Sequence, residues 1–146
     1  SEGFDLKNEN LKKFINGIST NVGAAVNDMG WDLNSQLVRI TQMWAIINKK
    51  GNFNTEHIHP NSNLSAAYYV KAPKNCGDFK IGNPHSISRD KFPEREKPTE
   101  LNRLVAKIPV TEGDLLIFPS YLPHSVLPNE SDEDRIVVSF NIYINR

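Results

Sequence analysis

Two periodicities of apolar residues divide the chain into a helical beginning and a longer run of strands. Over residues 5–20, apolar side chains recur every three or four positions with Lys and Glu between them, at Leu11, Phe14 and Ile18 among others. This spacing predicts an amphipathic helix, whose end is weakened by Gly17. Residues 21–34 are compatible with a short helix or a loop.

From Gln36 onward the pattern changes to short runs of β-branched and aromatic residues, separated by turn-forming Gly, Pro, Asn and Asp. Such runs predict strands. We expect about eight of them, over residues 36–48, 55–59, 64–71, 78–82, 104–110, 115–120, 124–128 and 135–145. The expected fold is therefore mainly β: a double-stranded β-helix (jelly roll) with the N-terminal helical segment packed on the sheet, in a single domain over residues 1–146.

The last predicted strand has two different faces. Its apolar face carries Ile136, Val138, Phe140, Ile142 and Ile144, whereas the alternate positions carry Arg135, Val137, Ser139, Asn141 and Tyr143. A mostly polar face on an otherwise apolar strand is compatible with a barrel whose interior holds a polar ligand. A sheet face turned toward water is the alternative.

One long segment, residues 83–103, is polar, charged and contains proline. Segments of this length without predicted secondary structure are usually functional or mobile. A lid or substrate-recognition role and a simple solvated insertion both remain open.

Composition excludes several functional classes. The 146 residues include 17 basic and 17 acidic side chains, so no charge excess indicates a nucleic-acid groove or an anionic membrane surface. No apolar run approaches the ~20 residues of a membrane span. A single cysteine, Cys76, cannot form an intramolecular disulfide. With no signal peptide apparent, we expect a reducing compartment, the cytoplasm.

The chemistry is concentrated in the histidines. His57 and His59 are two positions apart in "EHIHP", a spacing that places both side chains on one face of a strand. His124 opens a later predicted strand. Each alone would be an ordinary surface or core residue, but three imidazoles brought together suit Fe, Zn, Cu or Ni and leave coordination positions open.

Three stretches carry a resemblance to a known family: "GNFNTEHIHPNSNLSAAYYVKAP", "EGDLLIFPSYLPHSVLPN" and "DRIVVSFNIY". Together they resemble the Fe(II)- and 2-oxoglutarate-dependent oxygenases. More narrowly, they resemble a bacterial and phage-associated group related in fold to the prolyl hydroxylases. The resemblance covers about residues 40–146.

The resemblance implies an iron site built from His57, His59 and His124. In the family, the middle ligand is a carboxylate, and here it is His59. That departure leaves an iron centre with one negative charge fewer. Three-histidine iron remains workable for oxygen chemistry, and an inactive jelly roll that binds 2-oxoglutarate or a protein partner is the alternative.

The resemblance also implies a 2-oxoglutarate site. Family members hold the distal carboxylate with a basic residue on the last strand, and Arg135 stands eleven residues after His124. Tyr69 and Ser139 match positions that often add hydroxyl groups, and Asn141 lies farther along the same face. A surface ion pair is the alternative for Arg135, and ordinary strand packing is the alternative for Tyr69.

The implied function is hydroxylation of an unidentified substrate with O2 and 2-oxoglutarate, releasing succinate and CO2. A protein prolyl residue is one candidate substrate by analogy of fold, and a host cytoplasm is the expected location if the chain is phage-encoded. A three-histidine cupin-type metalloenzyme is a rival, because Gly51, Gly113 and Pro119 match cupin spacings. However, the cupin glutamate is missing, and Tyr121 replaces a cupin glycine.

Overall fold

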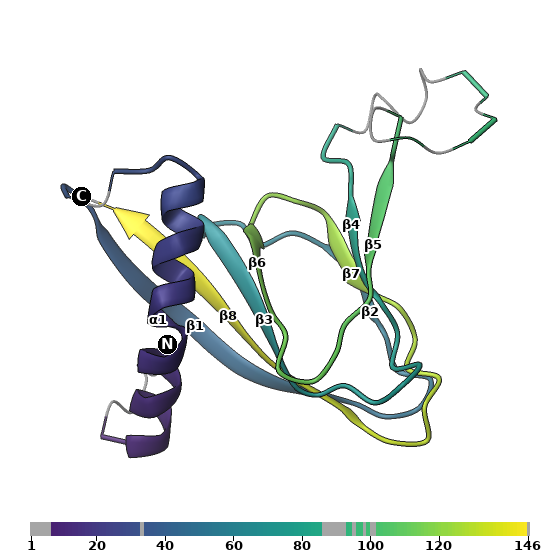
Figure 1. The fold of residues 1–146 in the computed structure, drawn as a ribbon, viewed down its shortest axis with the longest axis horizontal. Helices are drawn as coiled ribbons and strands as arrows, with labels where there is room; N and C mark the ends of the chain where they lie inside the picture. The colour runs from purple at the N-terminus through teal and green to yellow at the C-terminus, as the bar shows by residue number, and fades with distance from the viewer. Residues whose placement is uncertain are drawn as a thin grey trace. The chain divides into compact units, whose positions relative to one another are not determined.

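The computed structural model describes residues 7–32, 34–85, 93–94, 96–97, 99 and 102–145. The chain divides into two compact units, and the larger one is Arg39–Ile144. A single domain over residues 1–146 stays a prediction. The described elements, in chain order (Figure 1), are α1 (Glu9–Asp28), β1 (Leu37–Asn48), β2 (Asn54–His57), β3 (Leu64–Lys71), β4 (Phe79–Gly82), β5 (Val105–Ile108), β6 (Leu115–Pro119), β7 (His124–Val126) and β8 (Arg135–Asn145).

Helix α1 is longer than the sequence pattern predicts. The side chain of Asn8 caps its start by accepting from the N–H groups of Asn10 and Leu11. The helix continues past Gly17 because its buried stripe continues, at Ile18, Val22 and Val26. The predicted end near residue 20 is therefore wrong, and the ambiguous stretch that follows is helical as far as Asp28. Within the described residues, α1 does not reach the length and hydropathy required to cross a bilayer.

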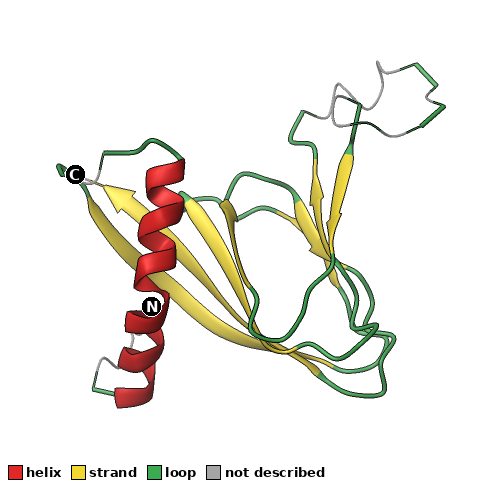
Figure 2. Ribbon diagram, in the orientation of Figure 1, coloured by secondary structure: helices red, strands yellow, loops and turns green. Residues whose placement is uncertain are grey.

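Eight strands form two four-stranded sheets, which Figure 2 shows in yellow. One has the order β1-β8-β3-β6, and the other has the order β2-β7-β4-β5. The pairs β2–β7, β3–β6, β3–β8, β4–β5 and β4–β7 are antiparallel. This arrangement confirms the predicted double-stranded β-helix. Strands far apart in sequence are neighbours in both sheets, so the chemistry-bearing residues of β2, β3, β7 and β8 can face one interior.

The interior of the first sheet is set by the register of β3 against β8. Tyr69 pairs with Val137 and Ala67 pairs with Ser139. Ala67, Tyr69 and Val137 form a buried cluster. Because side chains alternate along a strand, Arg135 and Ser139 lie on the same face of β8 as Val137.

The pairing of β2 with β7 places two of the three candidate histidines opposite each other. His57 and His124 are register partners in this ladder. Strand β2 ends at His57, two residues earlier than predicted. Pro60 has no N–H to donate to a ladder, and Asn61 adopts a left-handed φ of 68°. His59 therefore lies in a turn beyond the strand, which corrects the prediction that both histidines sit on β2.

The segment over residues 83–103 connects β4 to β5, which pair with each other. Residues 86–92, 95, 98, 100 and 101 lie outside the described part of the chain. A lid or recognition role for this segment stays a prediction.

Gly77 generates a stability prediction. It has φ of +89°, and a Cβ there would lie 2.6 Å from the carbonyl oxygen of Pro128. We expect Gly77→Ala to lower the free energy of unfolding by roughly 3 kcal/mol, because strain and a backbone collision add. Gly113→Ala is the matched control, since Gly113 has φ of +90° but nothing within 4 Å of the added Cβ.

The control variant should lose only about 1–2 kcal/mol, the cost of the left-handed conformation. Urea unfolding of both variants measures the difference. If both variants lose the same free energy of unfolding, the contact between a Cβ at residue 77 and the Pro128 carbonyl does not destabilise the fold.

Candidate active site

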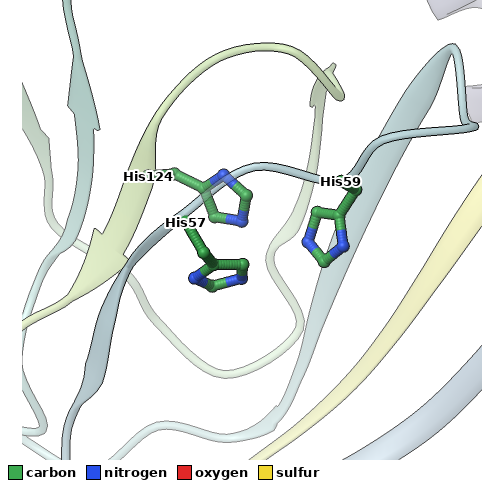
Figure 3. A group of neighbouring side chains, drawn as sticks. All are labelled: His57, His59 and His124. Atoms are coloured by element: carbon green, nitrogen blue, oxygen red, sulfur yellow. The ribbon is translucent and has the colours of Figure 1, made fainter.

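Three histidines converge in the larger unit. The ring centroids of His57 and His124 lie 4.3 Å apart, and His59 lies 4.9 Å from His57 and 5.0 Å from His124. One nitrogen from each ring can be chosen so that all three lie within 4.8 Å of one another. Figure 3 shows the three rings gathered between the end of β2, the following turn and the start of β7.

Backbone carbonyls orient two of the rings. His57 Nδ1 lies 2.7 Å from the Thr55 carbonyl oxygen, and His124 Nδ1 lies 2.9 Å from the Leu122 carbonyl oxygen. A carbonyl can only accept, so Nδ1 of each ring carries the proton and Nε2 keeps its lone pair. This tautomer leaves Nε2 of His57 and His124 as the nitrogen available to a metal ion.

Aromatic neighbours surround His124 and His59. Phe118 and Phe79 place their ring centroids 4.6 and 5.6 Å from that of His124, and Trp44 lies 5.8 Å from His59. Burial lowers the pKa of His124 from 6.5 to about 4 and lowers that of His59 as well. Both rings are therefore neutral at pH 7, the state in which imidazole binds metals.

The donor set fits a first-row transition metal. Three neutral imidazoles bind Fe(II), Co(II), Ni(II), Cu(II) or Zn(II) and leave positions open for other ligands. In the described part of the chain, the cluster contains no carboxylate. A metal bound here would keep its full positive charge.

A cavity of about 140 Å³ adjoins the histidines. Its wall combines the three imidazoles with apolar side chains and one permanent cation. Among the described residues, no Asp or Glu lines it; those that do are Trp44, Ile46, Asn48, Asn54, His57, His59, Ala66, Ala67, Tyr69, Phe79, Phe118, His124, Val126, Arg135, Val137 and Ser139.

Arg135 is the cation of this cavity, and its side chain is fully buried. Its Nη1 donates to the carbonyl oxygens of Cys76 and Leu127, the latter at 3.0 Å. Its Nε and Nη2 are buried without a hydrogen-bond partner. Burial lowers the pKa of Arg135, yet a guanidinium stays protonated in proteins. The alternative considered for Arg135, a surface ion pair with the adjacent acidic turn, is not among the salt bridges of the described residues.

Tyr69 and Ser139 line the same cavity as Arg135, whereas Asn141 does not. Burial raises the pKa of Tyr69, so its hydroxyl is protonated and can donate. Asn141 is buried farther along β8, where its side chain bonds Ser65 and Gln42. Of the seven predicted site residues, the structure brings six to one cavity and places the seventh beyond its end.

Sequence reasoning missed the aromatic wall and the backbone contacts. Trp44, Phe79 and Phe118 surround the imidazoles, but their positions match ordinary strand packing. The carbonyl groups of Cys76 and Leu127 hold Arg135. Every residue has a carbonyl group, so the sequence does not reveal which ones make such contacts. Only the Gly77 turn, which lets these segments approach, hints at them.

Fold and site together define a jelly-roll protein with a three-histidine cluster that can hold a metal ion. Residues 42–141 match the family described as "Putative 2OG-Fe(II) oxygenase", and the chain belongs to this family. The match confirms the predicted family, whose description names an enzyme class that uses Fe(II) and 2-oxoglutarate. None of the curated proteins compared with the chain matches it.

Solved structures with this fold are similar to the chain at low identity. A Pseudomonas putida prolyl-4-hydroxylase matches with a TM-score of 0.63 and 14% identity, over 97% of this chain and 70% of its own. A Burkholderia pseudomallei oxidoreductase of the 2OG-Fe(II) oxygenase family matches with a TM-score of 0.58 and 12% identity, over 75% of this chain. The match spans only 46% of that protein.

HygX from Streptomyces hygroscopicus, solved with nickel and 2-oxoglutarate bound, matches with a TM-score of 0.50 and 13% identity. That match covers 73% of this chain and 56% of HygX. At such identities the structural matches show the shared fold.

The buried imidazole of His124 makes stability depend on pH. In the metal-free protein, the folded state takes up this proton only near pH 4, whereas the unfolded chain takes it up near 6.5. We expect the free energy of unfolding to fall as pH drops from 6.5 to 4, by on the order of 2 kcal/mol from this group. Urea unfolding across this range measures it.

His124→Gln is the control, because glutamine has no proton to gain. The variant should lose that part of the pH dependence and keep the part due to carboxylates. Identical pH profiles for the two proteins would show that His124 is not held neutral by burial.

Proposed function

We propose that this chain is an Fe(II)- and 2-oxoglutarate-dependent dioxygenase that hydroxylates its substrate. One observation carries the proposal: a fully buried Arg135, with two unpartnered donors, lines the same cavity as three converging imidazoles. A buried charge without a partner is costly, so such an arrangement is typical of a site completed by a ligand.

In this proposal, Arg135 binds the distal carboxylate of 2-oxoglutarate. Its Nε and Nη2 are neighbouring donors on one edge of the guanidinium, which matches the two oxygens of a carboxylate. Nη1 is already bonded to two carbonyls, so the group is held in place before the ligand arrives. The protonated hydroxyl of Tyr69 and that of Ser139 supply further polar contacts from the same wall.

His57, His59 and His124 hold the metal in this proposal, through Nε2 for the two rings whose Nδ1 is bonded to a carbonyl. Bound Fe(II) would activate O2, and O2 would be the oxidant both for the conversion of 2-oxoglutarate to succinate and CO2 and for the hydroxylation of the substrate. Phe79 and Phe118 pack against His124, and Trp44 packs against His59. Burial lowers the pKa of both His124 and His59, which keeps these two rings neutral.

The two rival functions differ from this proposal in what they require of Arg135. A cupin-type metalloenzyme has no need for a cation buried in its interior. A binding module would use Arg135 to hold 2-oxoglutarate but would show no turnover. The family match and the unpartnered guanidinium favour the oxygenase.

A prolyl residue in a protein is the proposed substrate. The likeness to the Pseudomonas putida prolyl-4-hydroxylase supports it. Two exposed apolar side chains near the site also support it. Ile58, 50% exposed, lies between His57 and His59. Tyr121, 60% exposed, follows Ser120, whose carbonyl accepts from the His59 N–H. The proposed location is a reducing cytoplasm, which fits the free thiol of Cys76, and a host cell's cytoplasm if the chain is phage-encoded.

Substitution of Arg135 tests the co-substrate site. Arg135→Lys keeps the charge but lacks the planar pair of donors, so we expect the Kd for 2-oxoglutarate to rise roughly tenfold or more. The Kd for metal should change less than about twofold, because Arg135 is not a metal ligand. Anaerobic titration followed through the visible charge-transfer band measures the first, and Co(II) titration measures the second.

If Arg135→Lys loses affinity for both 2-oxoglutarate and Co(II), and its circular dichroism spectrum is altered, then Arg135 is needed for the fold and not for binding the co-substrate.

Turnover tests the reaction. We expect protein reconstituted with Fe(II) and supplied with O2 to convert 2-oxoglutarate to succinate, faster with proline-containing peptides than with matched alanine peptides. Mass spectrometry should detect a gain of one oxygen on the peptide. His124→Ala should abolish succinate formation while leaving the fold intact. Succinate without peptide oxidation would support the oxygenase and reject the prolyl substrate. Tight 2-oxoglutarate binding without succinate, whichever peptide is added, would favour the binding module.

A further inference from the structure

A chain of buried hydrogen bonds lies beside the candidate site without lining its cavity. Ser65 Oγ lies 2.8 Å from Ser120 Oγ and 2.9 Å from Asn141 Oδ1. Asn141 Nδ2 donates to Gln42 Oε1 at 2.9 Å. Ser65, Ser120 and Asn141 are at most 2% exposed. These residues come from β3, the turn after β6, β8 and β1, and none of them is among the residues that line the cavity.

The chemistry of the groups gives this chain a direction. The amide nitrogen of Asn141 faces an oxygen of Gln42, so its oxygen faces Ser65 and can only accept. The single hydroxyl proton of Ser65 is therefore donated to Asn141, and Ser65 must accept from Ser120. Donation runs from Ser120 through Ser65 and Asn141 to Gln42. Every link is needed, because a buried group left unpaired costs free energy.

Ser120 connects this chain to the turn that carries His59. Its N–H donates to the Asn63 carbonyl at 3.1 Å, and its carbonyl accepts from the His59 N–H at 3.0 Å. The two ends of the turn are thus held by one residue. Asn63 is bonded in turn to β8, through the Ile142 carbonyl at 2.9 Å and the Ile144 N–H at 2.8 Å.

His59 needs such support more than the other two histidines do. His57 and His124 face each other in the β2–β7 ladder, whose hydrogen bonds fix their backbone. His59 lies beyond the end of β2, and its ring makes no hydrogen bond within the described residues. Its position relative to the other rings depends on the turn and on Ser120.

We propose that Ser120, Ser65 and Asn141 are positioning residues that hold His59 in place for metal binding. This inference rests on the proposed three-histidine metal site. Outer partners that orient a ligand typically change metal affinity by roughly 10–100-fold when removed. Here the effect passes through the backbone of one histidine, so the expected loss is at the lower end, about tenfold.

A double-mutant cycle tests the proposal with Co(II) as the probe. The four proteins are wild type, Ser120→Ala, His59→Ala and the double variant, each prepared metal-free. Ser120→Ala should weaken Co(II) binding about tenfold in the wild-type background and less than about twofold when His59 is already absent. The visible Co(II) spectrum of Ser120→Ala should shift toward that of His59→Ala.

The outcomes separate the two levels of the proposal. A wild-type protein that binds no Co(II) contradicts the metal site itself and the positioning role with it. Wild-type binding with equal losses from Ser120→Ala in both backgrounds, or with no loss in either, contradicts only the positioning role.

Asn129→Ala is the matched control for lost stability. Asn129 is fully buried, and its side-chain amide donates to the carbonyls of Asn48 and Glu133, neither of which bonds His59. This variant should unfold at lower urea concentration, as Ser120→Ala should, yet keep wild-type Co(II) affinity and spectrum. Loss of Co(II) affinity in both variants would attribute the effect to general destabilisation and overturn the proposal.

If Ser120→Ala does not fold, Ser120→Cys takes its place in the cycle, since a thiol has similar volume but donates weakly. The same dependence on His59 is expected, and its absence again contradicts the positioning role.

Discussion

The antiparallel pairing of β2 with β7 is the constraint on which the candidate site depends. It makes His57 and His124 register partners although they are 67 positions apart in sequence. The register of this ladder shifts between Asn54 and His57, and a further shift by one residue would turn the His57 side chain to the opposite face. Two carbonyls then orient the paired rings, one in β2 and one just before β7. The third imidazole comes to this fixed pair from a turn.

Arg135 follows from the same alternation in the other sheet. The face of β8 that bears Val137 must also bear the side chain two residues earlier, so the cation points into the interior. Its burial is sustained by carbonyls from two separate loops, at Cys76 and Leu127. Gly77 allows those loops to approach. Two histidines and a buried cation thus reach one cavity from two sheets, each placed by strand geometry.

The sequence was sufficient for the elements that have strong periodicity. Strand β8 occupies the predicted residues 135–145, because an unbroken apolar alternation has no other good arrangement. Two boundaries could not be predicted. Helix α1 runs on because the apolar stripe through Val22 and Val26 outweighs the low helix propensity of glycine. Strand β2 stops early because the turn at Asn61 is a tertiary feature, held by contacts with Ser120 and β8.

Prediction of the candidate site had the same limit. Residue types and spacing predicted the three histidines as candidate metal ligands, and the family resemblance added Arg135 as a candidate 2-oxoglutarate ligand. The contacts that orient them are mostly backbone carbonyls, which every residue possesses. Asn141 shows both what the sequence can predict and what only the structure reveals. The alternation rule places it on the interior face, but only the register of β3 against β8 shows that it meets Ser65 there.

The unpartnered edge of Arg135 has a consequence for how much folded protein is present. A buried guanidinium with two unpaired donors lowers the stability of the ligand-free state. A carboxylate ligand that pairs with it binds only the folded chain, so ligand supply shifts the folding equilibrium. At a hundred times the Kd this shift amounts to about 2.7 kcal/mol. Lifetime against proteolysis would then follow the ligand concentration, which would link the abundance of the protein to the supply of the proposed co-substrate.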